Sequence, residues 1–322
     1  ALAGNYGWNT GVGTVSPDGQ YGVLIDGKDN VTIRNIGSIQ NFHVGIVVNN
    51  ANTGIFIHHN GISNIPYSAM QVVGSSGVTM EYNTISNVVS TAGCVVHISS
   101  SESSDLSHND LSGSGGEYNV CIANSNGVDV DANTIPYNGD GIISGMPLSS
   151  DIQIRNMNLG NGEWYVGGCN PSCSTTHVHS VSFVDNIGGR ITLDHTQGVD
   201  IISSTFSNAP EAIQIKPSQT GGHNIIDNTF DTISGTAIHL STVVNNQGHT
   251  ITGNTFTNNI VGIYHHNNNN QISNNNFVGN ADDIKIGEDS PWTNEDDGYS
   301  TSTSTFSQNY WSDFDSAAET CY

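Results

Sequence analysis

A short pattern that recurs about every 24 residues constrains the fold of this chain more than any other feature. The pattern reads G-x-x-I-x-x-N-x-(I/F)-x-N and is clearest from Gly248 to Asn280. One position of the repeat, which holds Asn in most copies, recurs at steps of 21 to 26 residues. The aligned positions are Asn35, Asn60, Asn83, Asn109, Asn133, Asn156, Val181, Ser204, Asn228, Asn254 and Asn275. A spacing this regular predicts a solenoid.

Apolar and polar residues alternate within each repeat, and no stretch sustains a period of 3.6 residues. Val31-Thr-Ile33 and Ala212-Ile-Gln-Ile215 show the alternation, which is typical of a strand with one buried face. A second buried position is expected at Ile36, Ile62, Ile85, Leu111, Ile135, Phe183, Phe206, Phe230, Phe256 and Phe277. Three short strands per repeat predict an all-β, single-domain, right-handed parallel β-helix of about twelve coils, roughly 55 Å long at about 4.8 Å per coil.

The chain divides into three parts on this pattern. Residues 1–20 lack the period and are expected to form an N-terminal cap or extension, and residues 21–286 form the β-helix. Residues 287–322 are expected to hold an acidic loop, a last coil and a tail. The recurrent asparagines are expected to bond from coil to coil through their side-chain amides and to occupy left-handed corners.

The repeat resembles one found in several β-helix families. It is similar to that of pectate-lyase-like enzymes, of the NosD-like periplasmic copper-processing family, and of many archaeal and bacterial surface proteins, over about residues 20–315. The segment Asn309-Tyr-Trp-Ser-Asp-Phe314 resembles an ending common in NosD-like and archaeal surface β-helices. The Asp/Gly-rich tail that often follows is replaced by Asp315–Tyr322, so we carry no binding site over from the resemblance.

Charge excludes several classes of partner. The chain has 29 acidic and 6 basic residues among 322, a formal charge of −23. Nucleic acids and anionic membranes attract clustered bases, which this composition lacks. No apolar run approaches the length of about 18 residues that spans a bilayer. The chain begins at Ala1 without Met, which predicts a mature, processed N-terminus. We expect an extracellular or cell-surface protein.

Five cysteines favour an oxidising compartment. Cys94 and Cys121 are about one coil apart, so they are candidates for a disulfide between neighbouring coils. Cys321 would then remain near the C-terminus, and an odd cysteine suggests an intermolecular bond or a free thiol.

Two further cysteines lie beside two histidines. Cys169 and Cys173 suit a local disulfide, or with His177 and His179 a tetrahedral zinc or copper site. Adjacent histidines on a strand point to opposite faces, so paired histidines elsewhere are expected to be poor chelators. The other histidines considered are His43, His58, His59, His265 and His266.

A polysaccharide-active β-helix would carry its chemistry on an exposed sheet. Uronate lyases use a base, often Arg or Lys, with carboxylates that bind Ca²⁺, and glycosidases use carboxylates roughly 5–9.5 Å apart. The outward positions expected for the second strand of each coil are Val47, Gln71, His97, Cys121, Ile143, Thr192, Gln214, His239, Tyr264 and Lys285. This column contains no carboxylate pair and is partly apolar.

One charged cluster stands out near the middle of the chain. Its members are Arg190, Asp194, His195, Glu211 and Lys216, and Arg190 and Lys216 are about one coil apart. The cluster suits either structural salt bridges or a catalytic or sugar-binding site, and both hypotheses remain open. We therefore assign no catalytic or cofactor-binding residue.

A second acidic segment follows the last regular repeat. It lacks the spacing of an EF-hand loop, so a solvated loop competes with a Ca²⁺ site, and no metal ligand is assigned. Its acidic residues are Asp282, Asp283, Glu288, Asp289, Glu295, Asp296 and Asp297.

Two classes of function compete. We expect an extracellular structural protein that associates with itself, such as a surface-layer, sheath or filament subunit, because open solenoid ends expose unpaired strand edges. The alternative is a polysaccharide-active protein, a lyase or epimerase, or a glycan-binding β-helix, so enzymatic activity stays undecided. Metal handling in the NosD manner is a third hypothesis.

Overall fold

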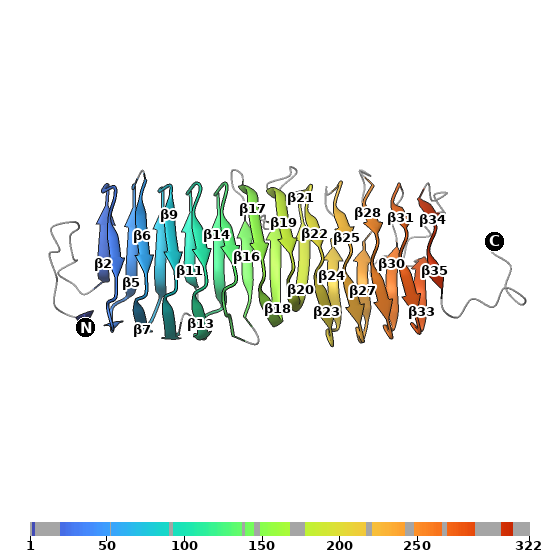
Figure 1. Ribbon diagram of the computed structural model, residues 1–322, viewed down its shortest axis with the longest axis horizontal. Helices are drawn as coiled ribbons and strands as arrows, with labels where there is room; N and C mark the ends of the chain where they lie inside the picture. The colour runs from blue at the N-terminus through green and yellow to red at the C-terminus, as the bar shows by residue number, and fades with distance from the viewer. Residues whose placement is uncertain are drawn as a thin grey trace, which may run out of the picture.

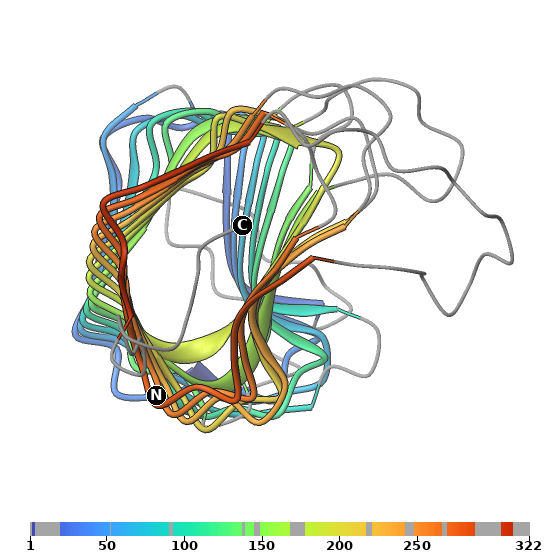
Figure 2. The ribbon, with the colours of Figure 1, turned by 90° about the vertical axis from the view of Figure 1, so that its right-hand side faces the viewer.

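The computed structural model is a parallel β-helix whose coils stack into one elongated body (Figure 1). Down the long axis, the coils lie over one another (Figure 2). The structure describes residues 2–3, 20–51, 53–89, 93–136, 139–144, 149–167, 178–216, 221–241, 248–265, 269–286 and 304–311. Helix is absent from these ranges, and within them no helix is long and apolar enough to cross a membrane. The predicted all-β solenoid is confirmed.

Three parallel sheets run the length of the body, and each coil contributes to them in turn. Sheet 1 contains β3 (Thr32–Arg34), β6 (Ile55–His58), β9 (Val78–Glu81), β12 (Asp105–Ser107), β15 (Asp129–Asp131), β17 (Ser149–Arg155), β19 (Val178–Val184), β22 (Asp200–Ile202), β25 (Asn224–Ile226), β28 (Thr250–Thr252), β31 (Gln271–Ser273) and β34 (Thr305–Ser307), and β21 (Thr196–Gln197) pairs with β19. Within the described residues, twelve strands follow one another along this sheet.

Sheets 2 and 3 complete the coil. Sheet 2 contains β1 (Leu2–Ala3), β4 (Ile39–Gln40), β7 (Gly61–Ile65), β10 (Thr84–Val88) and β13 (Asp110–Gly113), and later β23 (Thr205–Ser207), β26 (Thr229–Asp231), β29 (Thr255–Thr257), β32 (Asn276–Val278) and β35 (Tyr310–Trp311). Sheet 3 contains β2 (Tyr21–Asp26), β5 (Val44–Asn49), β8 (Ser68–Val73), β11 (Cys94–Ser99), β14 (Tyr118–Ala123), β16 (Gly141–Ser144), β18 (Asn158–Gly167), β20 (Ile187–Asp194), β24 (Glu211–Ile215), β27 (Thr236–Leu240), β30 (Val261–His265) and β33 (Asp282–Ile286). The two halves of sheet 2 are joined through the bridges of Thr134 to Asp110 and Asn158 and through the starts of β18 and β20.

A buried asparagine ladder runs along the corner after sheet 1. In Asn254, Oδ1 accepts the backbone N–H of Asn228 at 2.9 Å, and Nδ2 donates to the Ile225 carbonyl at 2.8 Å. The predicted coil-to-coil amide bonds are therefore present. The ladder asparagines are Asn60, Asn83, Asn109, Asn133, Asn186, Asn228, Asn254, Asn275 and Asn309.

Two of the aligned positions are one residue out of register. Asn35 and Asn156 have φ of 56° and 54° and sit at the left-handed corner that precedes the ladder. The ladder position is the next residue, which is Ile36 in the first coil and Met157 further along. Both positions are easily confused because Asn suits the left-handed corner and the buried ladder alike.

The coil after Met157 is also misaligned in the prediction. Val181 and Phe183 both lie in β19 of sheet 1, where Phe183 pairs with Ile154, and the ladder residue is Asn186. Ladder bonds join Met157 to Asn186 over 29 residues and Asn186 to Ser204 over 18. One coil is longer than the average and the next is shorter. Together they match the regular spacing, so the sequence did not reveal either one. In the first coil the second buried residue is Ile39, which pairs with Ile62, rather than Ile36.

The core is a set of stacked apolar rows. One row is aromatic, because Phe206, Phe230, Phe256 and Phe277 stack with ring centroids 4.7 to 5.2 Å apart. Trp311 stacks on Phe277 at 4.6 Å and ends the row. The Asn-Tyr-Trp motif thus closes the last described coil, with Asn309 as its ladder residue.

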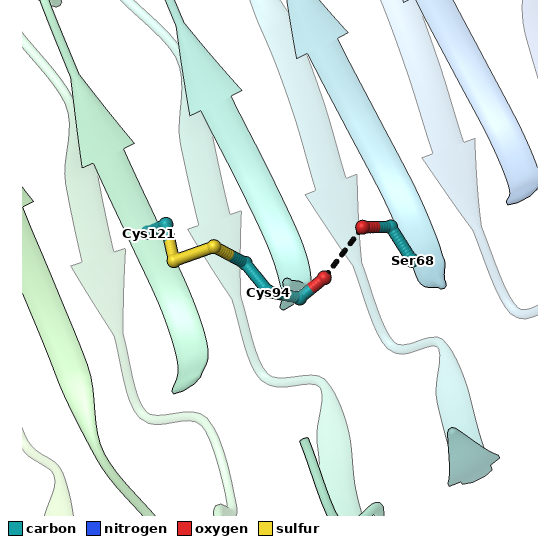
Figure 3. Close-up of a disulfide and its surroundings, with 3 residues drawn as sticks. All are labelled: Ser68, Cys94 and Cys121. Carbon is teal, nitrogen blue, oxygen red and sulfur yellow. Dashed lines mark hydrogen bonds between the residues drawn. A yellow bond between two sulfur atoms is a disulfide. The ribbon is translucent and has the colours of Figure 1, made fainter. Parts of the chain in front are cut away.

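The predicted disulfide between Cys94 and Cys121 is present and joins neighbouring strands β11 and β14 (Figure 3). Ser68 on β8 donates a hydrogen bond to the Cys94 carbonyl at 2.6 Å. Cys169, Cys173 and Cys321 lie outside the described residues.

Candidate functional site

The outward face of sheet 3 carries the candidate site. Strand register aligns one outward residue per coil into a row, and two corrections to the predicted column follow. Ile142, not Ile143, faces outward, because Ile143 is fully buried. Tyr165 fills a coil that the predicted column skipped. The observed row is Leu24, Val47, Gln71, His97, Cys121, Ile142, Tyr165, Thr192, Gln214, His239, Tyr264 and Lys285.

The alternation of β18 explains the direction of Tyr165. Trp164 is fully buried while Glu163 and Tyr165 on either side are partly exposed. The Trp164 ring packs over Gly141, where a Cβ would come within 2.5 Å of Trp164 Cδ2. A side chain at position 141 would displace the indole and, with it, the outward pair.

Asp194 is the centre of one hydrogen-bonded cluster. Tyr165 Oη donates to Asp194 Oδ2 at 2.6 Å, and His195 Nδ1 lies 2.7 Å from Asp194 Oδ1. Lys216 Nζ is 3.9 Å from Asp194 Oδ2 and 4.9 Å above the Tyr165 ring. Burial raises the pKa of Tyr165, and the hydrogen bond to Asp194 and its negative charge raise it further. Tyr165 is therefore held as a neutral donor.

Glu211 is the centre of a second cluster on the neighbouring strands. Arg190 Nη2 lies 2.7 Å from Glu211 Oε2 and donates to Gln214 Oε1 at 2.6 Å. His239 Nδ1 lies 3.1 Å from Glu211 Oε1. Burial alone would raise the pKa of Glu211, but the His239 hydrogen bond and the Arg190 charge outweigh it and lower the pKa. This carboxylate stays ionised.

Two further carboxylates belong to the same face and were not found from the sequence. Glu163 accepts a hydrogen bond from Thr192 and lies 3.9 Å from Arg190 Nε. Asp140 Oδ1 accepts the Glu163 N–H at 2.7 Å. Burial raises the pKa of Asp140, the Glu163 N–H opposes this, and the Glu163 charge adds to it. The strand alternation that places Tyr165 outward also identifies Glu163, two residues earlier.

The five residues of the predicted cluster are therefore brought together on adjoining strands. Arg190 and Glu211 form one group, and Asp194, His195 and Lys216 form the other. The single column contains no carboxylate pair, as expected, but carboxylates line both of its sides. Such a face offers hydrogen-bond donors, acceptors and acid–base groups in one plane.

The chain is a parallel β-helix protein, and the outward face of sheet 3 is its candidate binding face. The model of the periplasmic copper-binding protein family NosD matches residues 116–316, more than half of the chain. The chain belongs to the NosD family. The family description agrees with a location in the envelope or outside the cell.

Several solved β-helix structures resemble the chain. The A-module of a mannuronan C-5 epimerase from Azotobacter vinelandii is 12% identical with a TM-score of 0.46, and 89% of each chain is covered. A tailspike mutant of E. coli bacteriophage HK620, in complex with a pentasaccharide, is 12% identical with a TM-score of 0.46, covering 90% of this chain and 67% of the tailspike. The catalytic domain of an α-1,3-glucanase has a TM-score of 0.38 at 12% identity, covering 90% of this chain and 59% of that domain. No curated protein matches the sequence.

The name of the family gives copper as its ligand. Protein copper sites use imidazole, thiolate and thioether ligands. No group of three or more His, Cys, Asp or Glu side chains within the described ranges is arranged to hold a metal ion. Cys94 and Cys121 are joined in the disulfide, and three of the methionines, Met70, Met80 and Met157, are buried in the core. The described His, Cys and Met side chains therefore do not fit a copper site.

Paired histidines behave differently from the prediction at one position. His58 and His59 Nδ1 lie 2.9 Å apart, because His59 has φ of 55° at a corner and does not continue the strand. The two rings converge instead of pointing to opposite faces. Of the predicted Cys/His group, only His179 is described, and Val178 beside it is buried as expected.

The predicted acidic segment is described only in part. Asp282 and Asp283 lie in β33, and the remaining acidic residues of that segment fall outside the described residues. The Ca²⁺ hypothesis stays a prediction.

Proposed function

We propose that this chain binds a polysaccharide along the outward face of sheet 3. One observation carries the proposal: Tyr165, Gln214, His239 and Tyr264 lie in register on nearly consecutive strands. Thr192 occupies the strand between Tyr165 and Gln214 but is itself buried. A row of equivalent positions with a spacing of about 4.8 Å suits a ligand that also repeats.

The chemistry of the row suits sugars. Tyr165 and Tyr264 supply an apolar ring and a polar hydroxyl at the two ends. Gln214 and His239 supply hydrogen-bond donors and acceptors between them. Sugar rings present both apolar faces and hydroxyl groups, so a row of this composition supports contact with several units of a polymer.

The clusters beside the row define the second part of the proposal. The Asp194 cluster and the Glu211 cluster hold their side chains in fixed positions through the bonds described above. Fixed polar groups discriminate between hydroxyl orientations, because a mismatched partner leaves a buried polar atom unpaired. These clusters are proposed to select the sugar, and a site outside the cytoplasm gives it access to envelope or external polysaccharides.

Affinity electrophoresis through gels that contain soluble polysaccharides tests the proposal. Both neutral and acidic polymers are included, since the test concerns the site and not the sugar. Tyr264→Ala and His239→Ala are expected to weaken retention by a bound polymer about tenfold each, in line with the loss of a buried contact of about 1.4 kcal/mol. Gln153→Ala, on the exposed face of sheet 1, is the matched control and is expected to bind as the parent protein does.

Two results would overturn the proposal. One is a protein that no polysaccharide retains. The other is retention that Tyr264→Ala and His239→Ala leave unchanged while Gln153→Ala reduces it, because binding would then belong to sheet 1.

A further inference from the structure

The middle of the candidate face, between Asp140 and Lys216 in the sequence, carries more negative than positive charge. Four carboxylates lie on it, those of Asp140, Glu163, Asp194 and Glu211, against two cations, Arg190 and Lys216. With both histidines neutral, the sum is 2 − 4 = −2. Each cation is already beside a carboxylate: Arg190 Nη2 lies 2.7 Å from Glu211, and Lys216 Nζ lies 3.9 Å from Asp194.

No other base of the chain can supply the missing charge to the middle of the row. The sequence has six Lys and Arg residues, and all six are among the described residues. Lys28 and Arg34 belong to the first coil, and Arg155 pairs with Asp129 on sheet 1. Lys285 is next to Tyr264 at the end of the row, and its Nζ lies 3.9 Å from Asp282 Oδ2. The undescribed segments contain neither Lys nor Arg.

Electrostatics then decides between classes of polysaccharide. A polyuronate brings one carboxylate with each sugar unit, and a carboxylate placed between Tyr165 and His239 meets like charges without a spare cation. Like charges that face each other across an interface are costly. The formal net charge of −23 also slows the approach of a polyanion. An uncharged sugar meets neither barrier, and its hydroxyls can donate to the four carboxylates.

We infer that the polysaccharide bound by this face is uncharged, a neutral glycan whose hydroxyl groups donate to Asp194 and Glu211. The inference rests on the proposed function and narrows it. It also weighs against the lyase and epimerase alternatives considered from the sequence, because both chemistries act on a uronate whose carboxylate must be neutralised. Arg190 and Lys216, the bases expected for that work, are instead held by the protein's own carboxylates.

A matched pair of polymers tests the inference. Polygalacturonate and its carboxyl-reduced derivative share their linkage and differ at C6, where a carboxylate is replaced by an uncharged hydroxymethyl group. Alginate and carboxyl-reduced alginate form a second pair. Affinity electrophoresis and calorimetry are run at low salt, with and without Ca²⁺. The protein is expected to bind a carboxyl-reduced polymer or another neutral glycan at least tenfold more tightly than any polyuronate, and Tyr264→Ala is expected to weaken that binding.

A charge variant gives an independent readout. Glu211→Gln removes the carboxylate closest to Arg190 and is expected to raise retention by polygalacturonate about fivefold, the order of one released ion pair. Asp129→Asn is the control, because it releases Arg155 on sheet 1 and is expected to change nothing at this face. The variant Glu211→Asp keeps the charge beside Arg190 and is therefore not expected to raise retention by polygalacturonate.

The outcomes separate the two proposals. Site-dependent binding of a polyuronate, directly or only when Ca²⁺ bridges it, overturns the inference of an uncharged ligand and leaves the polysaccharide site standing. Polygalacturonate retention that Glu211→Gln does not raise also counts against the inference. Absence of binding to every polymer, charged or neutral, overturns the proposed function, and the inference falls with it.

Discussion

His223 and His249 occupy a buried corner where earlier coils place serine. Ser75, Ser101 and Ser125 each accept the backbone N–H of the preceding coil through Oγ. His223 and His249 accept equivalent N–H groups through Nδ1, at 3.1 and 3.4 Å. Their rings stack at 4.9 Å and are almost fully buried. An imidazole that accepts at Nδ1 must be neutral there, so protonation and native packing exclude each other.

This pair predicts loss of stability in acid. Burial, and after it the charge of His265, lowers the pKa of His249 to about 4, and burial with the charge of His249 lowers that of His223 well below 6.5. Because the unfolded state takes up the protons first, their contribution to stability is complete above pH 6.5 and declines as the pH falls toward the folded values. Two such groups cost about 3 kcal/mol between pH 6.5 and about pH 5.

Urea unfolding at neutral and at mildly acidic pH measures this dependence. The double variant His223→Asn and His249→Asn keeps a side-chain acceptor at both ladder positions, as Asn270 does, and is expected to flatten the pH profile. A double variant whose unfolding free energy falls as steeply in acid as that of the parent would show that other groups cause the loss.

At the scale of the element, the asparagine ladder ties each coil to the next. Asn254 is fully buried, accepts two hydrogen bonds from Asn228, and donates to Ile225 and Asn275. Asn254→Ala removes these bonds and leaves buried donors of Asn228 unpaired, which is expected to destabilise the protein by about 3 kcal/mol. Chemical denaturation followed by circular dichroism gives the value.

An exposed asparagine provides the control for the ladder. Asn208 has φ of 54° at a corner, and glycine adopts that conformation without strain. Asn208→Gly is therefore expected to change the unfolding free energy by less than about 0.5 kcal/mol. Equal losses in the two variants would refute a special role for the buried position.

At the scale of the whole molecule, the relevant feature is the C-terminal end of the described solenoid. Among the described residues, β33, β34 and β35 have no strand partner beyond them, and Phe306 and Tyr310 are exposed there. Unpaired strand edges favour association with another chain. The self-assembly expected from the sequence therefore has a physical reason, and it stays a prediction. Sedimentation velocity is expected to show mass that rises with concentration.

A charge at the end of the solenoid tests this assembly. Phe306→Lys is expected to reduce association, because a lysine on an edge opposes pairing with another chain. Val89→Lys, at an exposed apolar position in an earlier coil, serves as the control. A parent protein that remains monomeric at high concentration would eliminate the filament hypothesis.

The sequence by itself determined the parallel β-helix, the asparagine ladder as a class of contact and the Cys94–Cys121 pair. These follow from local patterns, since alternation sets the buried face and the period sets which residues stack. The tertiary structure alone decided the coil lengths between Met157 and Ser204 and the place of Tyr165 on the outward row. It also decided that Arg190 and Lys216 are held by carboxylates. The reason is physical: contacts across coils depend on register, and a slip of one residue exchanges the buried and exposed faces of a strand.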